Sequence, residues 1–283
     1  MVVLIPVDDP DDPRLAMFRL NERGLSNRPQ RRNDDGEGLF MAEGDLVVQR
    51  ALEAGCEPVV ALVDAARPPA VGRALADTIP VFAGGDRVRA MVTKLGVPNS
   101  IVAIFRRPPR TTVEALAATA RRLVLAEAVD NPANIGAIIR NAAGLGWDGL
   151  ITDATSADPL ARRSLRVSMG HALVLPHARA HHLDATVVAL ADAGFVIVAL
   201  TPDPAAIDIA DVIADGGPID RLVVCLGAER VGLSEQVRAA STLQVRIPMH
   251  RGVDSLNVAA ASAIACHALR PRTPPPPDPT TSR

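Results

Sequence analysis

The strongest constraint on the fold is a repeated alternation of short apolar strands and helices that begins at Leu123. Segments rich in valine, isoleucine and leucine, such as LVLAEAV, FVIVALT and LVVCLGAE, are separated by helical patterns near Ala133, Arg162, Leu183 and Ser234. This alternation predicts a parallel sheet covered by helices on both faces. Ligands of such sheets bind beyond the carboxyl ends of the strands, where we therefore look for a site.

The pattern also divides the chain into regions. Residues 1–35 are polar and Arg-rich, and 36–107 carry the strand-like segments PVVALV, IPVFAG and SIVAIF, which predict a small α/β domain. Two prolines break the chain after Arg107, so 108–122 is interpreted as a linker with a short helix behind Thr111 or Thr112. Residues 123–270 form the larger domain, and the Pro-rich tail 271–283 is expected to be disordered.

Composition and charge narrow the function. The formal net charge of −2 gives no global reason to bind nucleic acid, and only 2% of residues are aromatic, which argues against a base-stacking platform. Local arginine clusters leave contact with RNA open, although such runs are usually solvated faces. The first cluster contains Arg14, Arg19, Arg23, Arg28, Arg31 and Arg32, and the second Arg106, Arg107 and Arg110.

The sequence predicts a soluble protein, which we expect in the cytoplasm. No apolar run reaches the roughly 18 residues that a bilayer requires, and the N-terminus lacks a basic segment followed by an apolar one. Cys56, Cys225 and Cys266 are far apart and lie in apolar stretches, so we expect buried, unreactive thiols rather than disulfides or a zinc site. No metal is expected.

One motif is misleading. GLGWDG (144–149) matches the letters of the dinucleotide-binding fingerprint GxGxxG, which requires a strand before it and a helix after it. Here a helix precedes and the strand GLIT follows, so we interpret the motif as a helix end and a turn. The alternative function of a nucleotide-dependent oxidoreductase would depend on these glycines, which stand in the wrong place for that fingerprint.

The segment DNPANIGAIIRNAAGLG (130–146) is more informative. Asn134 can cap a helix with an apolar stripe, while Gly136, Arg140 and Gly144 lie four residues apart on another face. A glycine inside a helix costs about 1 kcal/mol relative to alanine, so two glycines beside Arg140 suggest that a ligand or another backbone comes close. An exposed arginine with incidental glycines is the alternative.

Polar residues also follow two later strands. Gly227 and Glu229 end LVVCLGAE, where a parallel sheet exposes its chemistry, although Glu229 could simply be a carboxylate at a helix start. Ile247 and Met249 end the next strand, before Ser255 and Asn257 start an alanine-rich helix. Capping explains one polar residue there but not obviously both.

In this order and spacing, NIGAIIR, LGAERVGLS and IPMHRGVDSLNVA resemble the three motifs of the SpoU (TrmH-type) family of SPOUT RNA methyltransferases, over about residues 123–270. The segment LFMAEGDLVVQRAL and the strands after it are similar to the small L30e/L7Ae-like substrate-binding domain of many family members. The family often has glycine where this chain has Arg251. The resemblance implies an α/β fold in which a small L30e/L7Ae-like domain precedes a parallel-sheet SPOUT domain with a deep trefoil knot.

The resemblance also implies S-adenosylmethionine as the cofactor, bent into the knotted loops. The residues expected to hold it are Leu200, Thr201, Gly227, Ile247, Met249 and Leu256. The residues expected at the reaction centre are Asn134, Arg140, Glu229, Ser255 and Asn257. Ser255 and Asn257 would be buried because they face that centre. The last helix would pack in the family's homodimer, which would place Asn134 and Arg140 near the partner's site.

The implied reaction is attack of a ribose 2′-hydroxyl on the methyl group of the cofactor. Because a guanidinium stays protonated at ordinary pH, we expect Arg140 to bind the substrate phosphate and stabilise the developing alkoxide rather than act as the base. Asn134 would orient Arg140, and Glu229 would hold the loop or assist the arginine. Ribosomal RNA is the preferred substrate, since an appended RNA-binding domain suits a structured local target. Transfer RNA, or a catalytically idle RNA-binding protein, remain alternatives.

Overall fold

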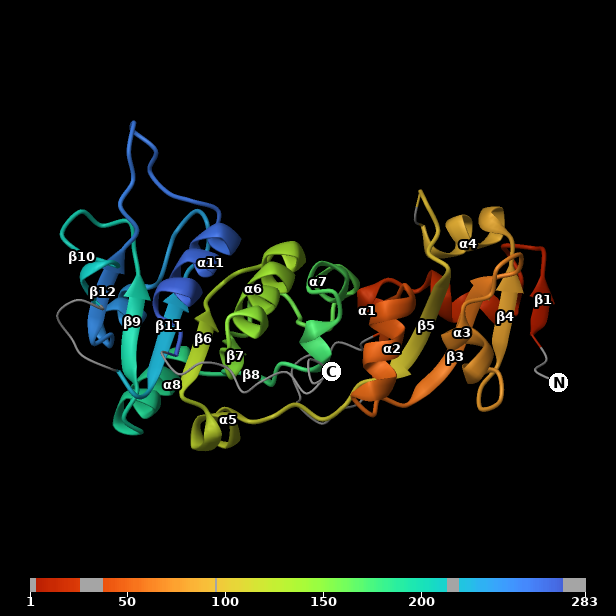
Figure 1. The fold of residues 1–283 in the computed structure, drawn as a ribbon, viewed down its shortest axis with the longest axis horizontal. Coiled ribbons are helices and arrows are strands. Elements are labelled where there is room, and N and C mark those ends of the chain that lie inside the picture. The colour runs from red at the N-terminus through yellow and green to blue at the C-terminus, as the bar shows by residue number, and fades with distance from the viewer. Residues whose placement is uncertain (1–3, 26–37, 95, 213–218, 272–283) are drawn as a thin grey trace, which may run out of the picture. The chain divides into compact units, whose positions relative to one another are not determined.

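The computed structural model describes residues 4–25, 38–94, 96–212 and 219–271, which form two compact units. The first unit comprises Met1–Arg110 and Asp158–Val174, and the second comprises Thr111–Ala157 and Leu175–Arg283. Each unit has its own sheet and its own hydrophobic core (Figure 1). The predicted tail falls almost wholly outside the described residues.

The first unit is built on a mixed five-stranded sheet. Its order is β1 (Ile5–Val7), β4 (Val81–Gly84), β3 (Pro58–Asp64), β5 (Ile101–Arg106) and β2 (Leu39–Glu43). The strands β1, β4 and β3 are parallel, and β5 is antiparallel to both β3 and β2. Its helices are η1 (Pro13–Arg19), α1 (Glu22–Leu25), α2 (Asp45–Glu53), α3 (Ala70–Leu75) and α4 (Asp86–Thr93).

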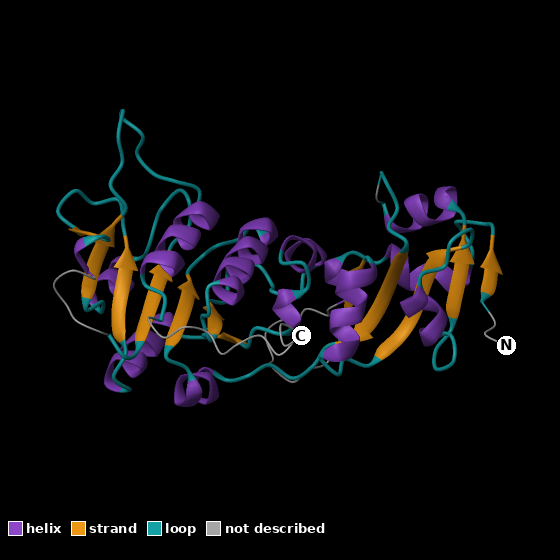
Figure 2. Cartoon of the chain, in the orientation of Figure 1, coloured by secondary structure: helices purple, strands orange, loops and turns teal. Residues whose placement is uncertain are grey.

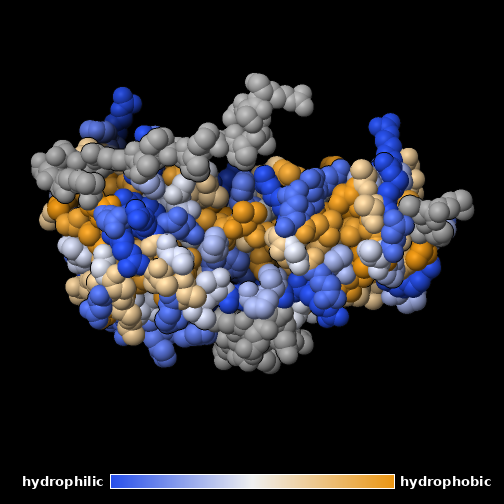
Figure 3. Space-filling view, turned by 60° about the horizontal axis from the view of Figure 1, so that its bottom comes forward, coloured by the Kyte–Doolittle hydropathy of each residue, from blue (hydrophilic) through white to orange (hydrophobic). Residues whose placement is uncertain are grey.

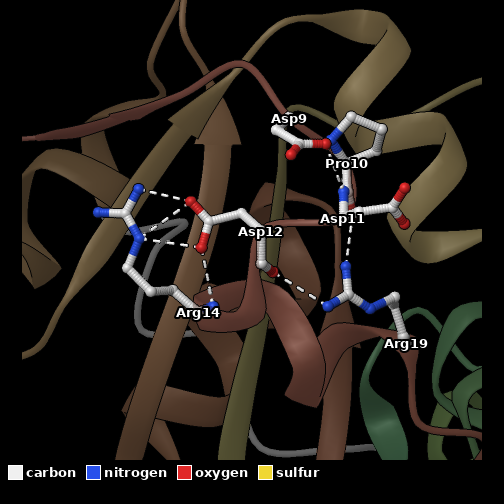
Figure 4. A network of polar contacts seen from close by, with 6 residues as sticks. All are labelled: Asp9, Pro10, Asp11, Asp12, Arg14 and Arg19. Atoms are coloured by element: carbon white, nitrogen blue, oxygen red, sulfur yellow. Dashed lines mark hydrogen bonds and ion pairs between the residues drawn. The ribbon is translucent and has the colours of Figure 1, made fainter.

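The N-terminal segment is not a polar appendage, as the sequence suggested, but part of this unit. The strand β1 extends the sheet, and Leu15 and Phe18 of η1 are almost completely buried. Arg14 pairs with Asp12, and Arg19 donates to the carbonyl oxygens of Pro10 and Asp12 (Figure 4). These two arginines therefore serve the fold, whereas Arg28, Arg31 and Arg32 lie outside the described residues and the side chain of Arg23 is not described.

A second difference from the sequence concerns residues 158–174, which were predicted to belong wholly to the larger domain. The helices of this segment, α7 (Arg162–Val167) and η2 (His171–Leu173), group with the first unit. Glu43 on β2 is buried and pairs with Arg162 and Arg166 of α7. Asp158 likewise pairs with Arg107 and Arg110, so most of the second arginine cluster is used inside the unit.

The second unit has the parallel sheet that the alternation predicted, with seven strands. Its order is β10 (Ile207–Asp208), β12 (Leu243–Arg246), β9 (Val196–Leu200), β11 (Leu222–Leu226), β6 (Arg122–Ala126), β7 (Gly149–Thr152) and β8 (His177–Arg179). Every strand pair is parallel. The central strands β11 and β6 are buried along their whole length, which explains their unbroken apolar sequences.

The helices of the second unit are α5 (Val113–Thr119), α6 (Pro132–Gly144), α8 (Leu183–Asp192), α10 (Glu235–Ala239) and α11 (Val258–Ala268) (Figure 2). Residues of α5, α8 and α10 share one core with alternate residues of the central strands. The helices α6 and α11 pack on one another, and Asn141 donates to the carbonyl oxygen of Ala259 and the hydroxyl of Ser262 at 2.9 and 2.8 Å. None of the helices among the described residues is long and apolar enough to cross a bilayer.

The predicted linker is also more structured than expected. Thr112 caps α5, and Leu116 of this helix is buried in the core of the second unit. Arg221 lies over the ring of Phe195, 3.9 Å from its centroid, and donates to the backbone carbonyl of Ala117 in α5. Because these contacts tie α5 to the sheet, residues 111–122 belong to the second unit and do not act as a free spacer.

Candidate active site

A cavity of about 440 Å³ opens at the carboxyl ends of β9 and β11. Its walls come from residues 200–202, from the loop 226–233 after β11, and from the segment between β12 and α11. The six residues assigned to cofactor binding all line it: Leu200, Thr201, Gly227, Ile247, Met249 and Leu256. Since β12, β9 and β11 are neighbouring parallel strands, their loops meet at one edge of the sheet, where such folds bind ligands.

A close approach of two backbone segments requires glycine at position 227. The loop after β11 turns back on itself, with the amide of Gly232 donating to the carbonyl oxygen of Ala228 at 2.9 Å. A Cβ atom on residue 227 would lie 2.2 Å from the carbonyl carbon of Gly232 and 2.3 Å from the amide nitrogen of Leu233. Both atoms are backbone, so no rotamer change could relieve the overlap. Only glycine fits this wall of the cavity.

Beside the cavity, three predicted site residues from distant segments form one hydrogen-bonded group, which we term the amide–carboxylate cluster. It comprises Asn134 of α6, Glu229 of the loop after β11 and Asn257 at the start of α11. The Nδ2 atoms of Asn134 and Asn257 donate to the same Glu229 oxygen, Oε1, at 2.9 and 2.5 Å. Asn257 Nδ2 also lies 3.2 Å from Asn134 Oδ1. The cluster therefore fixes α6, the cavity loop and α11 relative to one another.

Asn257 explains why polar residues stand at the start of an apolar helix. Its Oδ1 caps α11 by accepting from the amide of Ala259 at 2.9 Å, while its Nδ2 serves the cluster. Ser255 is not a cap and lines the cavity instead. Both residues are exposed, so the expectation that they are buried is wrong for this chain. They lie in an exposed stretch, 250–257, that borders an open cavity.

The structure also corrects the cap of α6. Asn131, not Asn134, is the capping residue, and its Oδ1 accepts from the amide of Ala133 at 2.9 Å. Pro132 occupies the first helical position, where proline is favoured, and this signal in the sequence pointed to Asn131. Asn134 therefore lies inside the first turn, 8% exposed, and directs its amide across to Glu229.

The loop before α6 is held by residues that the sequence analysis missed. Ala128 has a left-handed backbone (φ +54°), which is unfavourable for a residue with a side chain. The carboxylate of Asp153, just after β7, accepts from the amide of Ala128 at 3.0 Å and from the hydroxyl of Ser156 at 2.5 Å. Burial raises the pKa of Asp153, but hydrogen bonds from Ser156, Thr155 and backbone amides outweigh it, so the pKa is lowered overall.

Arg140 is not joined to the amide–carboxylate cluster. It is exposed on α6, and its side chain makes no hydrogen bond or ion pair with any residue that the structure describes. Arg140 lies six positions after Asn134, which is about 9 Å along a helix axis and on a different face. The expectation that Asn134 orients Arg140 is therefore wrong within one chain, because the amide of Asn134 is used by Glu229 and Asn257. Of the two neighbouring glycines, Gly144 is exposed, with nothing within 4 Å of an added Cβ.

At position 251, where the family often has glycine, this chain has an arginine with a left-handed backbone. Arg251 and Gly252 both adopt left-handed backbones, with φ of +59° and +73°. Glycine adopts that conformation without strain, which accounts for a family preference for glycine at position 251.

The three cysteines are buried and free, as the sequence predicted. Burial raises the pKa of the Cys56 thiol, and it raises the pKa of both Cys225 and Cys266 to about 12. Because the thiolate is the reactive form, these groups are unreactive near neutral pH. Within residues 4–25, 38–94, 96–212 and 219–271, no group of three His, Cys, Asp or Glu residues could hold a metal ion.

A cavity at the carboxyl edge of a parallel sheet, bordered by a fixed carboxylate and two amides, defines an α/β protein with a ligand-binding site of the kind enzymes use. The family model of the SpoU rRNA methylases matches residues 121–267. The chain belongs to this family.

Similar proteins support the assignment. The chain is 39% identical over 260 residues to an uncharacterized tRNA/rRNA methyltransferase of Mycobacterium bovis, covering 92% of this chain and 89% of that protein. It is 26% identical to the 23S rRNA (guanosine(2553)-2'-O)-methyltransferase RlmP of Bacillus subtilis, covering 82% and 88%. Among solved structures, the SpoU methyltransferase AviRb of Streptomyces viridochromogenes with AdoMet has a TM-score of 0.73 and 27% identity, covering 91% and 97%. An AdoMet-bound rRNA methyltransferase of Sinorhizobium meliloti shares the fold, with a TM-score of 0.75 and 24% identity, covering 94% and 97%.

Proposed function

We propose that the protein transfers a methyl group from S-adenosylmethionine to a ribose 2′-hydroxyl of RNA, with ribosomal RNA as the preferred substrate. The observation that carries this proposal is the joining of the cavity and the amide–carboxylate cluster at one edge of the parallel sheet. The name of RlmP, a 23S rRNA 2'-O-methyltransferase, supports the reaction and the substrate class. The name of the M. bovis relative covers both tRNA and rRNA, so transfer RNA is the alternative.

The cavity fits this cofactor. Apolar side chains such as Leu200, Ile247 and Leu256 would face the adenine, and the backbone at Gly227 leaves the space that a side chain would fill. A cavity of about 440 Å³ lies within the range of sites for small ligands. Bound there, S-adenosylmethionine supplies an electrophilic methyl group on a sulfonium.

The residues beside the cavity would then position the ribose. Glu229 is held by the two amides that donate to its Oε1, and Ser255 supplies a hydroxyl on the same rim. The guanidinium of Arg140 would bind the substrate phosphate and stabilise the negative charge that develops on the 2′-oxygen. Its exposure and lack of a partner among the described residues suit a group that meets RNA rather than its own fold.

Because Arg140 is exposed and lies on a different face of α6 from Asn134, it would serve the site of a second copy in a homodimer. The helix α11 is suited to such an interface, since it is built mainly of small residues and leaves Ile264 38% exposed. Exposed hydrophobic residues are visible among hydrophilic ones on the surface (Figure 3). This arrangement would bring Arg140 of one copy to Glu229 of the other.

Three further features come to this chain through the family resemblance. The loops after β9, β11 and β12 would form the deep trefoil knot that bends the cofactor. The first unit would be the L30e/L7Ae-like domain that binds RNA. The cytoplasm, where RNA is available, would be the place of action.

The direct test is transfer of labelled methyl from S-adenosylmethionine to total RNA that lacks the modification, followed by separation of RNA by size. The expected product is one labelled RNA class with a single linkage resistant to alkali, because a 2′-O-methyl group blocks attack on the phosphate. Label that remains alkali-sensitive would indicate base methylation and contradict the proposal. Cofactor binding without any transfer would favour the idle RNA-binding alternative.

Arg140 variants test the role of the guanidinium in that assay. Arg140→Ala should lower the rate about 100-fold or more, as loss of a charge-stabilising donor does elsewhere. Arg140→Lys should remain well below wild type, because an ammonium cannot make the bidentate contact. Full activity of Arg140→Lys would rule that contact out.

A further inference from the structure

A basic residue of the cavity, Arg238, has no role in the account so far. It lies on α10, which follows the loop that carries Gly227 and Glu229 in the chain, and it lines the cavity. Arg230 lines the cavity too but is exposed, whereas the side chain of Arg238 is only 35% exposed. Arg230 lies within the segment LGAERVGLS, whereas Arg238 lies outside the three segments that carry the family resemblance.

The backbone that carries Arg238 is fixed. Ser234 caps α10, accepting from the amide of Val237 at 3.3 Å, and its own amide donates to Glu127 Oε2 at 2.8 Å. Val237, the neighbour of Arg238, is completely buried in the core of the second unit. The guanidinium is therefore presented to the cavity from a rigid element.

Some donors of the Arg238 guanidinium have no strong partner. Its only ion pair among the described residues is with Glu235, one turn earlier on α10 and 75% exposed, and such surface pairs are weak. The Nε atom is buried and has no hydrogen-bond partner among the described residues. The pair with Glu235 uses Nη2, so Nη1 is left to donate a charge-assisted hydrogen bond to an acceptor that enters the cavity.

The chemistry of the acceptor follows from the proposed cofactor. S-adenosylmethionine carries one anionic group, the carboxylate of its amino-acid end, and guanidinium groups bind carboxylates in preference to neutral acceptors. Glu229 and Asp254, which also line the cavity, give it acidic groups that would favour the ammonium and sulfonium rather than the carboxylate. We propose that Arg238 binds the carboxylate of the cofactor and so selects ligands with an intact amino-acid end, an inference that rests on the proposed function.

The test compares two ligands that differ in this group alone. S-adenosylhomocysteine and its methyl ester are titrated calorimetrically into the full chain, as wild type and as Arg238→Gln. Wild type should prefer the acid about tenfold or more, and Arg238→Gln should bind the acid about ten- to a hundredfold more weakly while its affinity for the ester changes less than about threefold. Retained ester binding also shows that the variant is folded.

Two further variants sharpen the result. Glu235→Gln releases Arg238 from its surface pair, so binding of the acid should stay equal or become tighter. Arg238→Lys keeps the charge but loses the planar fork, and should fall between wild type and Arg238→Gln.

The inference is overturned if Arg238→Gln weakens acid and ester equally, or weakens neither. It is also overturned if Arg230→Gln, and not Arg238→Gln, removes the preference for the acid. Absence of the proposed cofactor site would look different, because wild type would then bind neither ligand, and failure of the proposed methyl transfer to RNA is detected separately in the labelled-methyl assay.

Discussion

At position 227 the fold leaves no room for a side chain, because the backbone of Gly232 and Leu233 lies against it. Gly227→Ala should therefore destabilise the protein by about 2–4 kcal/mol, or displace the loop and abolish cofactor binding. Urea unfolding and calorimetric titration measure the two effects. Gly144→Ala is the matched control: it meets open space at the end of α6 and should be neutral or stabilising by up to about 1 kcal/mol. Equal behaviour of the two variants would contradict the packing at Gly227.

Asp153 gives a residue-scale prediction that depends on pH. Its lowered pKa means that the folded state favours the carboxylate, so this stabilisation is present above the unfolded pKa of about 3.9 and is lost as pH falls through the folded value. Asp153→Asn should lower the free energy of unfolding by about 1–3 kcal/mol at pH 7. The difference in this free energy between the variant and wild type should shrink below about pH 4. Urea unfolding at the two pH values measures it. Asp192→Asn, at an exposed position, should change stability by less than about 0.5 kcal/mol at both.

At the scale of elements, periodicity predicted most of the second unit but not the ends or partners of its elements. The strands at 149–152, 196–200 and 222–226 follow from apolar runs that any buried parallel strand requires. The helix predicted near Arg162 is short and ends at Val167. No local pattern could show that residues 158–174 pack on the first unit, because buried ion pairs with Glu43 and Asp158 decide it.

That anchoring gives the prediction for the element α7. Glu43→Gln would leave Arg162 and Arg166 beside a neutral, buried amide, so stability should fall by about 3–5 kcal/mol and hydrogen exchange should quicken in residues 158–174. Glu57→Gln is the comparison, because Glu57 pairs with Arg106 at the surface, with both side chains more than half exposed. It should cost less than about 1 kcal/mol. Unchanged exchange in 158–174 of Glu43→Gln would contradict the anchoring.

At the scale of the whole molecule, the sequence predicted a site at the carboxyl ends of the parallel strands, and the structure has a cavity at that edge of the sheet. It did not show how the site residues contact one another. The hydrogen bonds among Asn134, Glu229 and Asn257 join positions that are 28, 95 and 123 residues apart, and the packing of α6 on α11 helps to bring them together. Arg238 carried no signal in the sequence, since a lone arginine on a short amphipathic helix looks like any surface charge.

The central claim is that methyl transfer occurs at a site built from Glu229 of one chain and Arg140 of another. The most direct measurement is RNA methyl transfer by heterodimers of Glu229→Gln and Arg140→Ala chains, co-expressed with different tags and purified through both. Each variant alone should be nearly inactive. The heterodimer keeps one intact site of two, so its activity should return to about half that of wild type. A heterodimer as inactive as its parents would contradict the shared site.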